Sequence, residues 1–410
     1  MTFKLKINGI LKYLVVLFVI LAGPTTYYVY FHSAPTHIVL LMLSILLFIR
    51  NKKIKKKNLK VAFTIIVLLV IVSIFHFDIS RVNSIIIMLI KLIVICIMCS
   101  NFKKEEFATC FINLMLVELL VSFLCFVVCI NGLEQTLPGY FTQRVDYTVG
   151  GVEGYYIYYL TPYYTVGWLS TGGFFGRNAG LFSEPGMHAI MLNICILYIL
   201  AGFVDEYFDK RRKRIILAVF ILGVLTTKSI GGYVELLLIV SFFMTRKITV
   251  NSLKKDIPIG IGLGVITLLT LFYGTVFDRL LNQSGSYVTR LNDTVGGLTL
   301  ATKNVFIGMG FFTDISMDLE KLGIINMSNE LVQLLIRFGF PITVLLLTLS
   351  VKGMARTFDC KGLPLFILAL FLIVVISGES FFWEISILVW MFYWKTRIDD
   401  NTEPRITFRN

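Results

Sequence analysis

RNAGLFSEPGMHAIMLNICILYILAGFV, residues 177–204, joins a polar turn to an apolar run of the kind that enters a lipid bilayer. Similar apolar runs recur along all 410 residues, and 57% of the residues are hydrophobic, whereas soluble domains usually contain about 45–50%. A backbone in lipid must satisfy its own hydrogen bonds, so such runs form helices. The sequence therefore predicts an all-α, polytopic membrane protein.

The apolar runs predict about twelve membrane-spanning helices, and residues 1–410 are expected to form a single integral membrane domain. Two long loops, 132–186 and 275–327, interrupt them and are predicted to face outward. Several runs are shorter than the ~20 residues that cross a bilayer without tilt. The predicted spans are 10–30, 36–49, 61–76, 82–100, 107–131, 187–204, 215–227, 232–244, 257–274, 328–350, 363–377 and 380–394.

The net charge of +13 follows a topological pattern. When the N-terminus is placed inside, most lysines and arginines fall in inside segments, including RNKKIKKKNLK (50–60) and DKRRKR (209–214). This is the distribution that the positive-inside rule describes. We therefore expect both termini to be cytoplasmic, the lipid bilayer to be the main partner, and no nucleic acid to bind.

The cysteines and histidines lack the spacing of a ligand set. The seven cysteines fall in spans or on the inside, and the four histidines are scattered. These patterns predict neither a structural disulfide nor a metal site. There is no Walker loop and no dinucleotide fingerprint.

The loop 132–186 is rich in tyrosine and glycine. A tyrosine offers a flat apolar face and one hydroxyl, which suits stacking on sugars. Tyrosine also collects at the level of lipid headgroups in an aromatic belt. Both interpretations stay open for tyrosines such as Tyr158 and Tyr163.

The segment RNAGLFSEPG (177–186) combines an arginine with a Glu-Pro pair at the entrance of a predicted span. The Arg177 guanidinium is suited to bidentate binding of phosphate. Glu184 precedes Pro185 and should be extended, with Pro185 opening the next helix. The segment is either a site for an anion or a helix cap with a local Arg–Glu ion pair.

Arg337 is predicted to lie about ten residues inside its span, which is ~15 Å at the helical rise per residue. An arginine near the bilayer centre costs at least ~2.5–3.5 kcal/mol. We therefore expect a partner, either a glutamate or a substrate phosphate. The other intramembrane charges could mark an ion path or fix helix packing through ion pairs, and they are Lys91, Glu118, Glu235 and Glu384.

Two further segments interrupt the apolar pattern. TTKSIGGYVELL (226–237) is expected to form either a tight turn at the outer surface, where Lys228 could meet an anion, or a broken helix. RLNDTVGGLTLATKNVFIGMGFF (290–312) begins with a helical apolar rhythm that Gly308-Met309-Gly310 stops. A solvated surface helix is the simple interpretation of the second segment.

Four segments together resemble the Wzy-type O-antigen and capsular polysaccharide polymerases of the O-antigen polymerase/ligase superfamily. RNAGLFSEPG (177–186) looks like the family's Arg, Gly, Phe, Glu-Pro segment, and TTKSIGGYVELLL (226–238) is similar to its threonine–serine–glycine turn. RLNDTVGGLTLATKNVFIGMGFF (290–312) looks like its arginine, helix and Gly-x-Gly. SNELVQLLIRFGFPITVLL (328–346) resembles its last motif, which opens a span.

The resemblance covers roughly residues 175–350, where the segments keep the family's order, and the N-terminal half agrees only in topology. Ligases of the superfamily often carry a histidine where this chain has Ser328. That departure, together with the Glu-Pro pair, favours polymerase over ligase.

The resemblance implies a glycosyltransferase that polymerises undecaprenyl-diphosphate-linked oligosaccharides at the outer face of the bacterial cytoplasmic membrane, without a cofactor. A chain-length regulator and a flippase of the same pathway are candidate partners. The charged candidates for catalysis are Arg177, Glu184, Arg290 and Arg337. The candidates for substrate binding are Lys228, Lys303, Asn329, Glu330, Tyr158 and Tyr163.

Within this interpretation the arginines hold diphosphate, and Glu184 is the base for the acceptor hydroxyl or the partner of Arg177. An O-antigen ligase is one alternative. A flippase or exporter of lipid-linked sugars is another, in which the intramembrane charges would couple transport.

Overall fold

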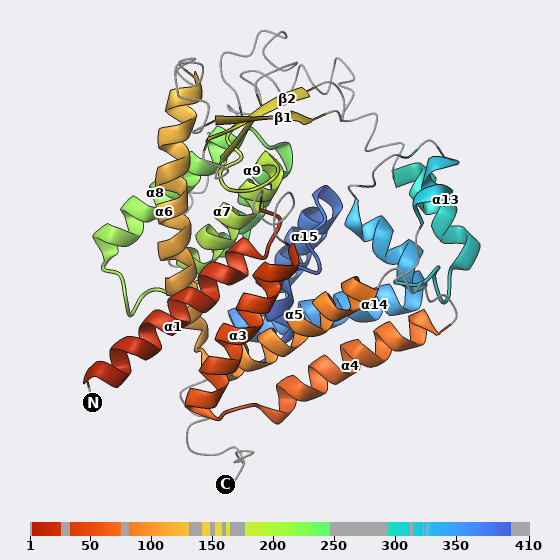
Figure 1. Ribbon diagram of the computed structural model, residues 1–410, viewed down its shortest axis with the longest axis horizontal. Coiled ribbons are helices and arrows are strands. Elements are labelled where there is room, and N and C mark those ends of the chain that lie inside the picture. The colour runs from red at the N-terminus through yellow and green to blue at the C-terminus, as the bar shows by residue number, and fades with distance from the viewer. Residues whose placement is uncertain are drawn as a thin grey trace. The chain divides into compact units, whose positions relative to one another are not determined.

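The computed structural model describes residues 2–25, 33–74, 82–130, 142–147, 152–157, 161–164, 177–246, 294–311, 315–322, 324, 327 and 329–394 (Figure 1). The chain divides into two compact units. Unit 1 contains Met1–Val19, Ala34–Phe107 and Gln283–Asn410, and unit 2 contains Ile20–Ser33 and Ala108–Asn282.

Unit 1 is built from helices of the N-terminal and C-terminal parts of the chain. In the first part, α1 (Thr2–Leu21) is followed by α3 (Ser33–Asn51), α4 (Lys56–Ser73) and α5 (Val82–Asn101). In the last part, residues 294–301 are helical. They lead into η3 (Thr302–Asn304), α13 (Ser316–Glu320), α14 (Glu330–Phe358), α15 (Leu363–Gly378), α16 (Ile385–Leu388) and η4 (Val389–Met391).

Unit 2 contains most of α6 (Lys104–Ile130), together with α7 (Pro185–Leu200), α8 (Lys210–Thr227) and α9 (Ile230–Arg246). Nearly every residue of α7 is buried, and α7 packs against α8 and α9. A helix that is apolar on all sides is expected at the centre of such a bundle.

Three short strands form an antiparallel sheet within the first predicted outer loop. They are β1 (Thr142–Tyr147), β2 (Val152–Ile157) and β3 (Thr161–Tyr164), in the order β1-β2-β3. Tyr155 on β2 is the Cα partner of Tyr163 on β3. Gly150 and Gly151 lie between two runs rich in valine and tyrosine, which is a hairpin signal. The sequence predicts an all-α protein, and this three-stranded sheet was not part of that prediction.

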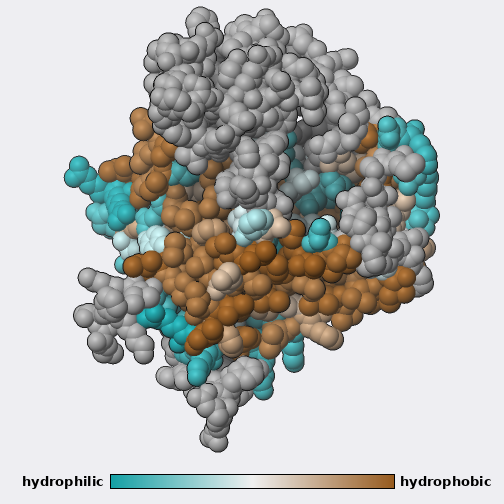
Figure 2. All heavy atoms as spheres, viewed as in Figure 1, coloured by the Kyte–Doolittle hydropathy of each residue, from teal (hydrophilic) through white to brown (hydrophobic). Residues whose placement is uncertain are grey.

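The length and composition of several helices indicate a membrane protein. Four helices in the described part of the chain are long and apolar enough to span a membrane: Ala34–Asn51, Val82–Asn101, Lys104–Leu124 and Glu330–Phe358. Figure 2 shows hydrophobic side chains gathered over α3 and α4, where Ile38, Met42 and Phe63 are exposed. An apolar surface of this extent belongs in lipid.

The twelve-span prediction is not confirmed, although most of the predicted spans coincide with helices. Each predicted span up to residue 244, and those at 328–350 and 363–377, overlaps a helix. The span at 257–274 lies outside the described residues. Residues 380–394 form only α16 and η4 within irregular backbone, almost all of it buried, so this segment is not a single spanning helix. Such backbone is tolerated at membrane depth where protein surrounds it.

Candidate functional site

Helix α14 is broken near its first third. Gly339 has φ 68° and ψ 173°, which are not helical, and Pro341 follows it. Proline has no N–H and cannot continue the hydrogen-bond ladder across the break. The helix therefore consists of a first arm, Glu330–Phe338, and a longer second arm that ends at Phe358.

Residues 305–310 pack into this break, and their backbone bonds to it. The N–H of Met309 donates to the carbonyl of Ile336 at 2.7 Å, and the N–H of Gly310 donates to the carbonyl of Arg337 at 3.1 Å. In the other direction, Phe340 N–H donates to Val305 O at 2.7 Å. In lipid each unsatisfied backbone group costs several kcal/mol. These three bonds satisfy backbone groups at the break.

Two glycines allow this close approach. A Cβ on Gly308 would lie 2.4 Å from the backbone carbonyl of Arg337, and one on Gly339 would lie 2.7 Å from the backbone of Phe306. Both glycines have positive φ angles, 72° and 68°, which other residues adopt only with strain. We call residues 305–311 together with 330–340 the α14 break.

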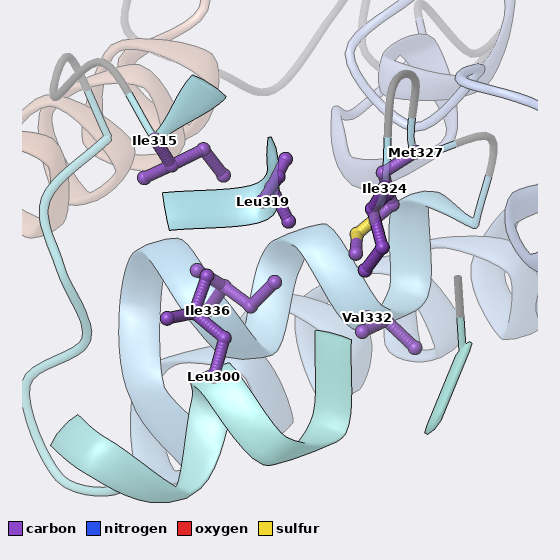
Figure 3. Close-up of a cluster of buried hydrophobic side chains, with 7 residues drawn as sticks. All are labelled: Leu300, Ile315, Leu319, Ile324, Met327, Val332 and Ile336. Carbon is purple, nitrogen blue, oxygen red and sulfur yellow. The ribbon is translucent and has the colours of Figure 1, made fainter. Parts of the chain in front are cut away.

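An apolar cluster joins the described residues 294–301, 315–322, 324 and 327 to the first arm of α14 (Figure 3). The seven buried side chains are Leu300, Ile315, Leu319, Ile324, Met327, Val332 and Ile336. Residues 294–301 form a helix with one buried face and one exposed face, on which Val295, Leu298 and Thr299 lie. Leu300 on the other face is fully buried.

A cavity of about 220 Å³ opens at the α14 break. Its walls come from α5, the first arm of α14, the end of residues 305–311 and the connection between α15 and α16. The lining residues are Ser84, Phe311, Glu330, Gln333, Leu334, Arg337 and Trp383. Ligand pockets commonly measure about 300–1,000 Å³, so this one has room for a phosphate group or one sugar.

Arg337 and Glu330 are seven residues apart on the first arm, which places them on the same helix face. The Arg337 guanidinium donates from Nη1 to the carbonyl of Phe311. Its Cζ also lies 6.0 Å from the centroid of the Phe311 ring. The sequence predicts a glutamate or a phosphate as the partner of Arg337. In the structure, the guanidinium contacts the backbone carbonyl and the ring of Phe311.

Three aromatic rings surround the cavity wall beside Arg337. The ring of Phe311 lies 5.2 Å from that of Phe338 and 5.1 Å from that of Trp383, between centroids. Phe338 and Trp383 are 5.7 Å apart. Flat faces of this kind stack on sugars or on guanidinium groups.

The connection that carries Trp383 is held from two sides. The Glu330 carboxylate accepts a hydrogen bond from the N–H of Phe382. From α5, Lys91 donates to the carbonyl of Trp383 at 3.2 Å and forms an ion pair with Glu384 at 3.1 Å. Lys91 is buried. The pair therefore follows the packing interpretation of the intramembrane charges, and it positions Trp383.

In unit 2, the structure confirms the local geometry predicted for RNAGLFSEPG. Glu184 is the extended N-cap of α7, with φ −141° and ψ 147°, and Pro185 is the first helical residue. The Glu184 side chain makes no cap hydrogen bond and is exposed. We call residues 177–186 the α7 entry loop.

The α7 entry loop is tied to the end of α8. Arg177 Nε donates to the carbonyl of Thr227 at 3.1 Å, and Asn178 N–H donates to the carbonyl of Thr226 at 3.0 Å. Lys228 follows as a left-handed C-cap with φ 49°. The tight-turn interpretation of 226–237 is therefore confirmed, and Arg177 and Lys228 lie at the same helix end.

A buried histidine–carboxylate pair supports the same loop. Glu118 accepts from the N–H of Leu181 at 2.9 Å through Oε1, and its Oε2 lies 3.2 Å from His188 Nε2. The remaining intramembrane carboxylate, Glu235, accepts from Asn193 Nδ2 at 2.9 Å. Both contacts join helices of unit 2, as the packing interpretation predicts.

The structure distributes the predicted site residues over both units. Arg337 and Glu330 share the cavity of unit 1, whereas Arg177, Glu184 and Lys228 belong to unit 2. Lys303 is exposed on η3.

The other four predicted residues are not among those that line the cavity, or are not described. Asn329 caps α14 by accepting from Val332 N at 3.2 Å, and it donates to Thr294 Oγ1. Tyr163 lies on β3. Arg290 and Tyr158 fall outside the described residues.

The sequence prediction missed five residues of the cavity wall, Leu334 among them, and only two of the five carried a usable signal. Trp383 lies in the sequence ESFFWE (379–384), which interrupts an apolar region with aromatic and acidic residues. Phe311 follows directly after the Gly308–Gly310 segment that the motif already marked. Ser84 and Gln333 are ordinary residues of predicted spans and reach the site only through tertiary packing.

Comparison with known proteins finds no family model that matches the chain and no curated protein that matches it. The assignment of function therefore depends on the chemistry of the site.

Proposed function

We propose that the protein is a membrane glycosyltransferase that polymerises lipid-diphosphate-linked oligosaccharides. The observation that carries the proposal is the cavity at the α14 break, where a guanidinium, a carboxylate, an amide and an indole line one small space. Arginine is the side chain best suited to phosphate, and an indole beside it suits a sugar ring. The substrate implied by the sequence resemblance, undecaprenyl-diphosphate-linked oligosaccharide, contains both groups next to each other.

The reaction is a substitution at the anomeric carbon of the donor. An oxygen of an acceptor hydroxyl bonds to that carbon, and the bond from the carbon to the diphosphate oxygen breaks. The electron pair leaves with the diphosphate, where the fixed charge of Arg337 stabilises it. The hydroxyl proton passes to a carboxylate, for which we propose Glu330 because it lines the same cavity as Arg337.

The two units supply separate cations for two lipid-diphosphate substrates. In this proposal Arg337 serves one diphosphate, and Arg177 with Lys228 serves the other. Glu184, the base that the sequence predicts, belongs with the second group. A ligase would use the same donor chemistry with a different acceptor.

The proposed setting is the bacterial cytoplasmic membrane, with both termini inside and the second loop outside. The charge distribution along the sequence supports this orientation. Cysteine tags at Asp314 should react with an impermeant reagent in intact cells, and tags at Asn401 should not.

A second candidate function is transport of lipid-linked sugars, and the broken helix α14 favours it. Discontinuous membrane helices form substrate sites in many transporters. Purified protein in vesicles, supplied with lipid-linked repeat units, separates the two functions. Formation of polymer supports the glycosyltransferase. Movement of the lipid across the bilayer without a new glycosidic bond would support the transporter and overturn our first proposal.

A further inference from the structure

The outer surface of the second long loop carries large apolar side chains. Phe306 is the most exposed of them, at 77%. The others are Val295, Leu298, Val305, Ile307 and Leu322. Their backbone is held in place: the buried cluster anchors residues 294–301 and 315–322 to α14 (Figure 3), and the carbonyl of Val305 accepts a hydrogen bond from the N–H of Phe340. A fixed apolar face on a loop predicted to lie in water requires a partner.

This face continues the lipid-facing surface of α14. The N–H of Phe340 bonds to the carbonyl of Val305 at 2.7 Å, so the two residues lie side by side. Phe340, Val344 and Leu345 on the second arm of α14 are exposed as well. That arm belongs to a helix that is long and apolar enough to span the membrane. The lipid that covers it therefore extends onto Val305–Ile307.

Polar groups border the apolar face where headgroups would lie. Thr302, Lys303 and Asn304 of η3 are all exposed and directly precede Val305. Lysines beside an apolar surface place their charge at the level of lipid phosphates.

We propose that this face is seated in the outer leaflet of the membrane. We call it the lipid wedge, defined as Val295, Leu298, Val305–Ile307 and Leu322. Its occupant is lipid hydrocarbon, and Lys303 meets the headgroups. Since Gly310 and Phe311 lead from the wedge to Arg337 and its cavity, the wedge brings the cavity to the bilayer surface. The wedge itself needs only the membrane and does not depend on the proposed reaction.

Site-specific fluorescence in vesicles tests the wedge. The full chain, with its native cysteines replaced, would carry one new cysteine labelled with an environment-sensitive dye. The positions are Phe306→Cys and Val295→Cys on the wedge, Val344→Cys as the lipid-facing reference and Lys321→Cys as the aqueous reference. Vesicles of phosphatidylcholine and phosphatidylglycerol would contain a fraction of lipid with a spin label on the acyl chain.

We expect the dyes at 306 and 295 to be quenched by the spin-labelled lipid about as strongly as the dye at 344, and to be protected from aqueous iodide. The dye at 321 should show the reverse. Iodide quenching at 306 and 295 equal to that at 321 would overturn the proposal. In unlabelled Phe306→Cys protein treated with an added oxidant, a disulfide between two copies, together with no lipid quenching in the labelled form, would also overturn it and would identify a second copy as the occupant. Because two wedge positions are labelled, the test can still be interpreted if one variant fails to fold.

Discussion

The α14 break and the α7 entry loop each place an arginine where a backbone leaves helical geometry, but they surround it differently. Arg337 at the α14 break shares a cavity with Glu330 and Trp383. Arg177 in the α7 entry loop donates to a carbonyl at the end of α8, and its neighbour Asn178 bonds to the same helix end. A recognisable sequence segment therefore does not by itself determine how its arginine is surrounded. The groups that surround the arginine decide what it can bind.

The two regions also differ in the pair of charged side chains that supports each of them. Behind the α14 break, a buried lysine–glutamate pair holds the connection that carries Trp383. Behind the α7 entry loop, a glutamate–histidine pair holds the loop backbone. The first pair supports a side chain in a cavity, and the second supports the course of the main chain. Substitutions should therefore affect the two regions to different extents.

Replacing Lys91 should cause the largest loss of stability. Lys91→Met strands the Glu384 carboxylate in a buried position, and breaking such a pair costs about 3–5 kcal/mol. The melting temperature in detergent should fall clearly. The double variant Lys91→Met/Glu384→Gln should recover part of the loss, because no unpaired charge remains.

Lys213→Met is the matched control for Lys91→Met. Lys213 forms an ion pair of 2.7 Å with Asp205, but both side chains are more exposed. Exposed pairs contribute about 0–1 kcal/mol. Equal losses in the two lysine variants would mean that the Lys91 pair does not support the α14 break.

Gly339→Ala should destabilise the α14 break by about 2–4 kcal/mol, since positive φ strains alanine and the new Cβ meets the backbone of Phe306. Thermal unfolding in detergent measures the effect. Gly378→Ala is the control, because that glycine ends α15 and a Cβ there meets nothing within 4 Å. A loss no greater than that of Gly378→Ala would rule out the break as described.

Glu118→Ala should cost about 1–3 kcal/mol, because it leaves the N–H of Leu181 and the ring of His188 without their carboxylate. Glu118→Gln keeps one acceptor oxygen and should cost less. Melting temperatures of the two variants give the comparison. A negligible loss in both variants would mean that the Glu118 carboxylate does not hold the α7 entry loop.

The sequence predicted local features well because local rules set them. The extended backbone of Glu184 and the start of α7 at Pro185 follow from the sterics of proline. The turn at Lys228 follows from the polar interruption of an apolar run. Arg337 was identified as a candidate site residue from the free-energy cost of placing an arginine inside a membrane.

Other features were not predictable because they depend on residues far apart in the chain. Lys91 pairs with Glu384 across 293 residues of sequence, and no periodicity indicates such a pair. The break at Gly339 did have a signal in Gly339-Phe340-Pro341, but the surrounding apolar residues favoured a continuous span. Residues 380–394 were predicted to span the membrane because burial in protein and burial in lipid select the same apolar composition.

The most direct test of the central claim is Arg337→Lys, with polymer yield and melting temperature measured on the same preparation. Lysine keeps the charge but lacks the planar fork that binds phosphate through two hydrogen bonds. Lys321→Arg, at an exposed position of the outer loop, serves as the control. We predict that Arg337→Lys loses most of the polymer yield while its melting temperature stays near that of the native chain. A yield that is retained, or that falls only as far as the melting temperature does, would contradict the account.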